Sequence, residues 1–310
     1  MHTGLYQLMV SCIPESRSQC SASSHPLQAT GTLIPDMKPN DFFHRRFFLP
    51  SEHGSWIWWI GPFVLGAAAA DRWTSDLITL FMAMMATFLL RQPLTILVKT
   101  LSSRRAKSDR LPASLWVGIY SLIAIRSFAS LLAAGFGQLA VLLIPGVPVF
   151  IWQLFLVSRR AERGQRGIEI VGAGVLALAA PASYWIASGQ SSSLAWALWA
   201  IAWLQSAASI VLVYQRLQER NLDAPGDLSE RLKRAGRSLA YHSFNLSFIL
   251  LLWTQIELPW MVPLASALML LDAADSLRAP AVRWKPTRIG LRQLFASGLF
   301  MLLVSLGFLL

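Results

Sequence analysis

Arginine and histidine residues beside long apolar segments are the side chains in this sequence that could carry chemistry. The first group lies in the motif PSEHGSW, residues 50–56, where a long apolar segment begins. Gly54 leaves the backbone free to turn, and His53 could exchange a proton with a ligand or donate a hydrogen bond to it. The alternative is an ordinary helix start at which His53 faces lipid headgroups. We treat His53 and Gly54 as candidate ligand-binding residues.

Arg91 lies inside another apolar segment, about two helical turns from its end. An arginine at this depth either lines a polar cavity or extends its side chain to the membrane surface. Pro93 removes a backbone donor nearby and favours a kink. Arg91 is therefore a third candidate for ligand binding. Arg126 lies near the end of its own segment, where we expect its side chain to extend outward.

Two pairs of arginines are each four residues apart and so share one face of a helix. Arg216 and Arg220 follow one apolar segment, and Arg288 and Arg292 lie where another begins. Paired guanidinium groups suit phosphate or carboxylate ligands. The alternative is an interfacial cluster that contacts anionic lipid headgroups without specificity. Arg216, Arg220 and Arg288 are candidate ligand-binding residues.

His242 and Asn245, in the motif YHSFN, are three residues apart and can face the same direction on a helix. They are either ligand-binding residues or a polar pair that packs two helices together. Asp272 and Asp275 are also three residues apart. They could hold Mg²⁺ or form an ion pair with Arg278.

Familiar catalytic motifs are missing from the sequence, which contains no P-loop, GxSxG or HExxH pattern. The two cysteines, Cys12 and Cys20, do not form a CxxC pair. We therefore assign no catalytic residue and expect no cofactor, with Mg²⁺ at Asp272 and Asp275 only under a transferase interpretation.

Membrane-spanning helices are the elements that must position these side chains. Hydrophobic residues make up 55% of the 310 residues and charged residues only 14%, whereas a soluble domain has about 25% charged residues. The net charge of +11 comes from short basic clusters between apolar segments. This distribution argues against nucleic acid as a partner and in favour of membrane lipids. The composition predicts an all-α, polytopic transmembrane bundle.

Nine segments come close to the roughly 20 apolar residues that a spanning helix needs. The first, seventh and eighth are short, and the last two of these could form a hairpin that does not fully cross. Seven tryptophans lie mostly near segment ends and predict an interfacial aromatic belt. The segments are 55–70, 75–98, 112–133, 139–157, 168–187, 194–214, 239–254, 258–276 and 289–310.

The basic residues predict the orientation of these spans. All lysines and arginines other than Arg72, Arg91 and Arg126 fall in residues 1–54 or in alternate loops. Positively charged loops remain in the cytoplasm. We therefore expect the N-terminus inside and the C-terminus outside. Residues 1–36 are polar and rich in Ser and Pro, so we expect a disordered extension before a transmembrane domain at 45–310.

The residues around the first span resemble the YwiC-like family of bacterial membrane proteins. A Pro-x-x-His-Gly-x-Trp start runs directly into a span with Pro-Phe-x-x-Gly. The matching residues there are Pro50, His53, Gly54, Trp56, Pro62, Phe63 and Gly66. Later matches are Arg216, Arg220, Lys285, Pro286, Arg288, Ile289 and Gly290. The resemblance covers about residues 45–310 and implies a multi-span membrane protein in the bacterial plasma membrane.

Nine spans that start inside also resemble the architecture of UbiA-type prenyltransferases. That superfamily holds Mg²⁺ and a prenyl diphosphate with two Asp-rich motifs. The loop KTLSSRRAKSDR lacks the first motif, and Asp272 and Asp275 follow the eighth span, which is the wrong place. A divergent prenyl or lipid transferase, or a small-molecule transporter, is the alternative function. The leading hypothesis is a cytoplasm-facing cavity that binds an anionic lipid or an isoprenoid-phosphate-like ligand.

Overall fold

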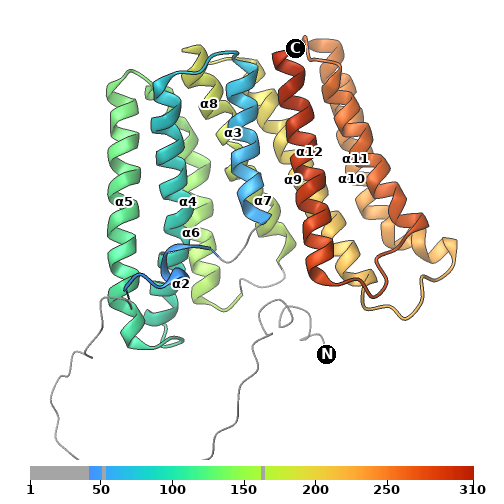
Figure 1. Cartoon of the computed structure of the whole chain (residues 1–310), viewed down its shortest axis with the longest axis horizontal. Helices are drawn as coiled ribbons and strands as arrows, with labels where there is room; N and C mark the ends of the chain where they lie inside the picture. Colours follow the sequence, from blue (N-terminus) through green and yellow to red (C-terminus); the bar gives the residue numbers. More distant parts are fainter. Residues whose placement is uncertain (1–41, 51–53, 162–164) are drawn as a thin grey trace, which may run out of the picture.

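The computed structural model describes residues 42–50, 54–161 and 165–310, and the regular elements in these residues are all helices (Figure 1). The expected extension, residues 1–36, and the candidate His53 lie outside the described residues. The elements are α2 (Arg45–Phe48), η2 (Gly54–Trp56), α3 (Ile57–Ala69), α4 (Ser75–Leu101), η3 (Lys107–Asp109), α5 (Arg110–Ala133), η4 (Gly137–Leu142), α6 (Leu143–Ser158), α7 (Arg166–Ala177), α8 (Ala179–Ser188), α9 (Ser193–Glu219), α10 (Leu228–Gln255), α11 (Met261–Arg278) and α12 (Pro286–Leu309).

Each apolar segment expected from the sequence coincides with a helix in the described part of the chain. One expected segment consists of α7 and α8 together, interrupted at Leu178. Among the residues that the structure describes, six helical stretches are long and apolar enough to cross a membrane: α4, η3 with α5, η4 with α6, α7 with α8, α9, and α12. The chain is therefore an all-α membrane protein.

The seventh segment is longer than the sequence predicted. We expected it to start at Leu239, but α10 starts at Leu228 and has 28 residues. The side chain of Asp227 caps it by accepting a 2.7 Å hydrogen bond from the Glu230 amide. The sequence predicts a loop for the first turns because they are basic. At 1.5 Å per residue the helix is about 42 Å long, longer than an apolar layer of about 30 Å.

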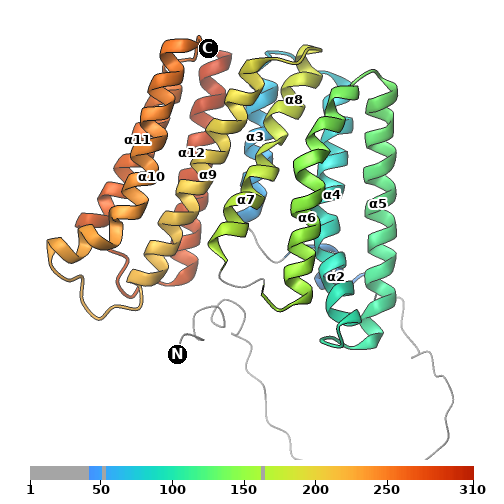
Figure 2. The ribbon, with the colours of Figure 1, turned by 180° about the vertical axis from the view of Figure 1, so that it is seen from behind.

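The helices stand side by side in two rows, which the front and back views both show (Figures 1 and 2). One row runs α5, α4, α3, α12, α11, and the other runs α6, α7 with α8, α9, α10. The loops α4–α5, α9–α10 and α11–α12 lie at one end of the bundle, where α6 also ends. The C-terminus and the connections α3–α4, α5–α6, α8–α9 and α10–α11 lie at the opposite end. The basic loops therefore gather at one end of the molecule.

The surface of the bundle is apolar at its outer helices. Only 6% of the most apolar stretch of α6 is buried, against 61% in α9. Large apolar side chains such as Ile144, Ile151 and Phe155 are exposed on α6. A soluble protein would bury these side chains, so this surface is suited to contact with lipid tails.

Small residues let α3 pack closely in the middle of the bundle. α3 contacts α7, α8, α9 and α12. A Cβ atom at Gly66 would overlap the Ala180 carbonyl oxygen and the Ser183 hydroxyl of α8. Ser183 directs that hydroxyl back to the carbonyls of its own helix, at 2.8 Å for Ala179 and 3.2 Å for Ala180. Close helix contacts through small residues are typical of membrane bundles.

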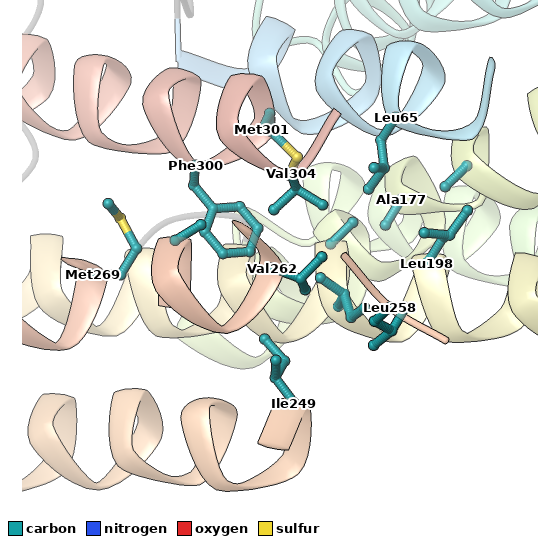
Figure 3. Packing of buried hydrophobic residues seen from close by; sticks show 14 of the residues in the cluster. Leu65, Ala177, Leu198, Ile249, Leu258, Val262, Met269, Phe300, Met301 and Val304 are labelled. Carbon is teal, nitrogen blue, oxygen red and sulfur yellow. The ribbon is translucent and has the colours of Figure 1, made fainter. Parts of the chain in front are cut away.

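Helices α9, α10, α11 and α12 form a four-helix bundle, because each contacts the next and α12 returns to α9. Its C-terminal end, near the end of α12, has an apolar core (Figure 3). Phe300 and Val304 of α12 meet Val262 of α11 and Leu198 of α9 there, and all four are completely buried. The half of this bundle that faces the basic loops contains polar residues instead.

Two of the seven tryptophans that the sequence places in an aromatic belt lie inside the bundle instead. Trp59 and Trp185 are buried in the bundle, with exposed fractions of 1% and 3%. Trp59 packs against Phe81 and Phe88 of α4, with ring centroids 5.3 and 5.9 Å apart. These two tryptophans therefore contribute to helix packing and do not lie at the lipid–water boundary.

Candidate functional site

A network of arginines and aspartates joins α9, α11 and α12 at the end that carries the basic loops. The Nη2 atom of Arg216 donates to the Asp272 carboxylate at 2.9 Å and to its backbone carbonyl at 3.2 Å. Arg292 donates to the other Asp272 oxygen from Nη2 at 2.6 Å and from Nε at 3.0 Å. It also reaches Asp275 at 2.8 Å. Asp272 thus lies between two cations from different helices.

Arg216 is among the most deeply buried side chains, with only 2% of its surface exposed. Burying a cation is costly unless an opposite charge lies beside it, and Asp272 provides that charge. The second terminal nitrogen of Arg216, Nη1, is buried without a hydrogen-bond partner among the described residues. This nitrogen is a donor inside the protein that the described residues leave unused.

The geometry favours the ion-pair interpretation of Asp272 and Asp275 over the metal interpretation. Both Asp272 oxygens accept hydrogen bonds from arginine. Within the described residues, no group of three or more His, Cys, Asp or Glu side chains could hold a metal ion. The partners of the aspartates are Arg216 and Arg292, not Arg278 as we had expected.

His242 and Asn245 lie on the buried face of α10, as their spacing predicted. His242 Nδ1 is 2.8 Å from the Ser238 carbonyl oxygen of its own helix. Asn245 Nδ2 donates to the Leu204 carbonyl oxygen of α9 at 2.8 Å. The Oδ1 atom of Asn245 is buried without a partner among the described residues. Asn245 therefore holds α10 against α9, whereas the printed contact of His242 lies within α10.

Sequence reasoning missed a second set of polar contacts at the same end. Gln215 of α9 donates to Glu219 at 2.7 Å and to Ser276 of α11 at 3.0 Å, and it accepts from Ser238 of α10. Glu219 also accepts from the Ala281 amide at 2.9 Å. The spacing of Gln215 and Glu219, four residues apart, was the available signal. Their partners lie far away in the sequence and could not be found from it.

A groove of about 700 Å³ runs along the N-terminal part of α12, next to the ion-pair network. Arg292 belongs to both. The guanidinium of Arg288 lies over the Trp284 ring, 4.0 Å from its centroid. Leu291 and Phe295 line the apolar side and are 66% and 72% exposed. The other lining residues are Arg283, Lys285 and Thr287. Cationic and apolar surfaces therefore adjoin in one groove.

Most, but not all, of the candidates come together. Arg216, His242 and Asn245 lie in the α9–α12 bundle, and Arg220 is tied to the loop before α12 because its carbonyl oxygen accepts from the Arg283 amide at 3.1 Å. Gly54 starts η2, directly before α3.

Arg91 lies elsewhere. With the Gln153 amide oxygen turned towards it, Arg91 donates to Gln153 of α6 at 2.7 and 3.0 Å. In Figure 1, α4 and α12 lie on opposite sides of α3. The structure therefore does not bring Arg91 to the other candidate residues, and the single cavity expected from the sequence does not include it.

Comparison with known proteins finds a family model that matches part of the chain. Residues 49–184 match the family model described as YwiC-like protein, which confirms the resemblance over this part of the chain. No curated protein and no solved structure matches the chain. The match covers α3 to α7 and most of α8, whereas the ion-pair network and the groove on α12 follow it in the sequence.

Proposed function

We propose that this YwiC-like membrane protein binds a phosphate-bearing anionic lipid, either a phospholipid or an isoprenoid-phosphate-like molecule, at the cytoplasmic end of its α9–α12 bundle. The groove on α12 is the observation that carries the proposal, because it places cations directly beside exposed apolar side chains. A lipid with a charged headgroup and apolar chains matches such a surface.

The proposed topology has nine spans in the bacterial plasma membrane, with the N-terminus inside and the C-terminus outside. It treats residues 45–310 as one transmembrane domain. The gathering of basic loops at one end of the bundle supports it, since positively charged loops remain in the cytoplasm (Figure 1). In this orientation the groove on α12 opens at the inner leaflet.

Charge balance supports an anionic ligand in the groove. Arg292 is neutralised by Asp272 and Asp275, and Arg283 pairs with Asp223 at 3.3 Å. Lys285 and Arg288 form no ion pair with any residue that the structure describes, and both are exposed. These two cations can neutralise a phosphate group at the level of the headgroups.

The remaining candidates have supporting roles in this proposal. Arg216 and Asp272 fix the position of Arg292, which lines the groove. Asn245 holds α10 against α9, and His242 is buried beside it with its contact to Ser238 within α10. Arg220 lies where α9 meets the loop that leads into α12. We retain His53 and Gly54 as candidates for the same cytoplasmic surface.

Native mass spectrometry of the purified protein with its retained lipids tests the proposal. We expect the double variant Lys285→Gln, Arg288→Gln to retain several-fold less phosphatidylglycerol and less added polyisoprenyl phosphate than the wild-type protein. Comparing the two lipids shows which headgroup the groove prefers. The matched control is Lys233→Gln, Arg237→Gln, which removes two exposed cations from α10 at the same end. Equal retention in both variants would refute the groove as a specific site.

The transferase alternative requires Asp272 to be available to Mg²⁺. Both of its oxygens are bound by arginine, which argues against it. Mg²⁺-dependent binding of a diphosphate lipid, abolished by Asp272→Asn, would favour a transferase over simple lipid binding. Uptake of a solute by reconstituted vesicles would favour a transporter.

A further inference from the structure

The half of the α9–α12 bundle that faces the basic loops has a polar interior. Ser209 of α9 is 3.3 Å from Ser297 of α12 and accepts a hydrogen bond from Gln293 of the same helix. Gln205 lies one turn before Ser209 on α9 and Arg216 two turns after it, so all three side chains share a face. The face of α10 that carries Asn245 closes the bundle opposite them. Each of these polar side chains is at least nine-tenths buried.

Four atoms in this interior are buried without a hydrogen-bond partner among the described residues. Two are donors, Gln205 Nε2 and Arg216 Nη1. Two are acceptors, Asn245 Oδ1 and Gln293 Oε1. Proteins rarely leave such groups unsatisfied, and an apolar bilayer offers them no solvent. Something that both donates and accepts hydrogen bonds must therefore reach them.

We propose that a column of bound water molecules occupies this interior and bonds to the four atoms. Water suits this set of two donors and two acceptors because each water molecule both donates and accepts hydrogen bonds. Buried waters typically make about three hydrogen bonds to polar groups of this kind. An anion would satisfy the two donors but would face the two acceptor oxygens. A metal ion would suit the acceptors but would face Gln205 Nε2 and the Arg216 guanidinium.

The proposed water column is open to solvent at one end only. It begins at the network of Arg216, Asp272 and Arg292, beside the groove on α12. It ends at the apolar core formed by Leu198, Val262, Phe300 and Val304 (Figure 3), whose four side chains are completely buried and offer water no hydrogen bond. Water enters the bundle from the end with the basic loops and does not cross it.

Met269 belongs to the apolar core at which the column ends, so its oxidation reports on water that reaches this boundary. It lies one turn before Asp272 on α11 and is only 4% exposed. We propose millisecond X-ray hydroxyl-radical labelling of the full-length protein in detergent after mixing with ¹⁸O water. Met82, which is 45% exposed on the surface of α4, is the reference for a methionine that detergent covers. We expect Met269 to take up ¹⁸O at a rate within about tenfold of Met82, although direct solvent does not reach it.

A variant with apolar side chains in the polar interior distinguishes two causes of Met269 labelling: bound water and general opening of the bundle. Gln205→Leu combined with Asn245→Leu replaces two of the four atoms with apolar groups of similar size. This variant should lower the labelling of Met269 several-fold and leave that of Met82 unchanged. Unmodified Met269 in the wild-type protein, under conditions that label Met82, would overturn the proposal even if the variant fails to fold.

Discussion

Asp272 is the residue on which the charge balance of the α9–α12 bundle depends. It accepts from two arginines, one of which is almost fully buried. Among the described residues the Asp275 carboxylate accepts only from Arg292, and its side chain is 45% exposed. The two carboxylates are close in sequence, but removing each one has a different effect on the arginine that it contacts. Loss of Asp272 would leave Arg216 inside the protein without an acidic partner at hydrogen-bond distance.

Asp272→Asn should therefore destabilise the protein by about 3 kcal/mol, because it leaves the buried cation of Arg216 without the negative charge that neutralises it. Asp275→Asn is the matched control and should cost less than about 1 kcal/mol, as expected for a partly exposed pair. Unfolding in detergent measures both. Equal losses in the two variants would contradict the central position of Asp272.

Arg91 and Arg288 should behave independently, because they lie on opposite sides of α3. Arg91→Gln weakens a contact with Gln153 between α4 and α6. We expect it to leave the retention of anionic lipid within about twofold of the wild-type value, since distant sites are usually additive. Native mass spectrometry of Arg91→Gln beside Arg288→Gln measures this. A similar loss of lipid in both variants would restore the single cavity expected from the sequence.

At the scale of the element, close packing distinguishes glycines that look alike in the sequence. Gly66 of α3 faces the Ala180 carbonyl, whereas Gly118 of α5 has no other group near the position of its missing Cβ atom. The two are therefore suited to a paired comparison.

Gly66→Ala should cost about 1–3 kcal/mol, since an added methyl group must push α3 and α8 apart. Gly118→Ala should be neutral or stabilising by up to about 1 kcal/mol, because alanine favours helix more than glycine does. Thermal unfolding in detergent compares the two. The packing of α3 against α8 would be contradicted if Gly66→Ala were tolerated as well as Gly118→Ala.

The sequence predicted where helices lie better than how they meet. Segment positions follow from apolar length, which lipid imposes on every span. The start of α10 was missed because its first turns are basic and amphipathic, so apolar length alone could not extend the helix back to Leu228. The pairing of Arg216 with Asp272 was missed for a different reason. It depends on the rotation of α9 and α11 about their axes, and no local pattern fixes that rotation.

At the scale of the whole molecule, the sorting of charge between the two ends predicts the topology. Alkaline phosphatase fused after Leu310 should be active, because the proposed orientation exports the C-terminus. Green fluorescent protein inserted next to Arg105, in the α4–α5 loop, should be fluorescent because that loop stays in the cytoplasm. Both reporters in one compartment would refute a nine-span arrangement.

The connections at the C-terminal end of the bundle are short, and this has a consequence for how the cell envelope treats the protein. Residues 70–74, 134–136, 189–192 and 256–260 make up these connections, none longer than five residues. A protease needs an extended stretch of several residues to bind, and such tight turns offer little of one. In the proposed orientation, proteases outside the cell therefore have few accessible peptide bonds to cleave. Proteases in the cytoplasm can instead cleave the longer loops beside α10 and α12.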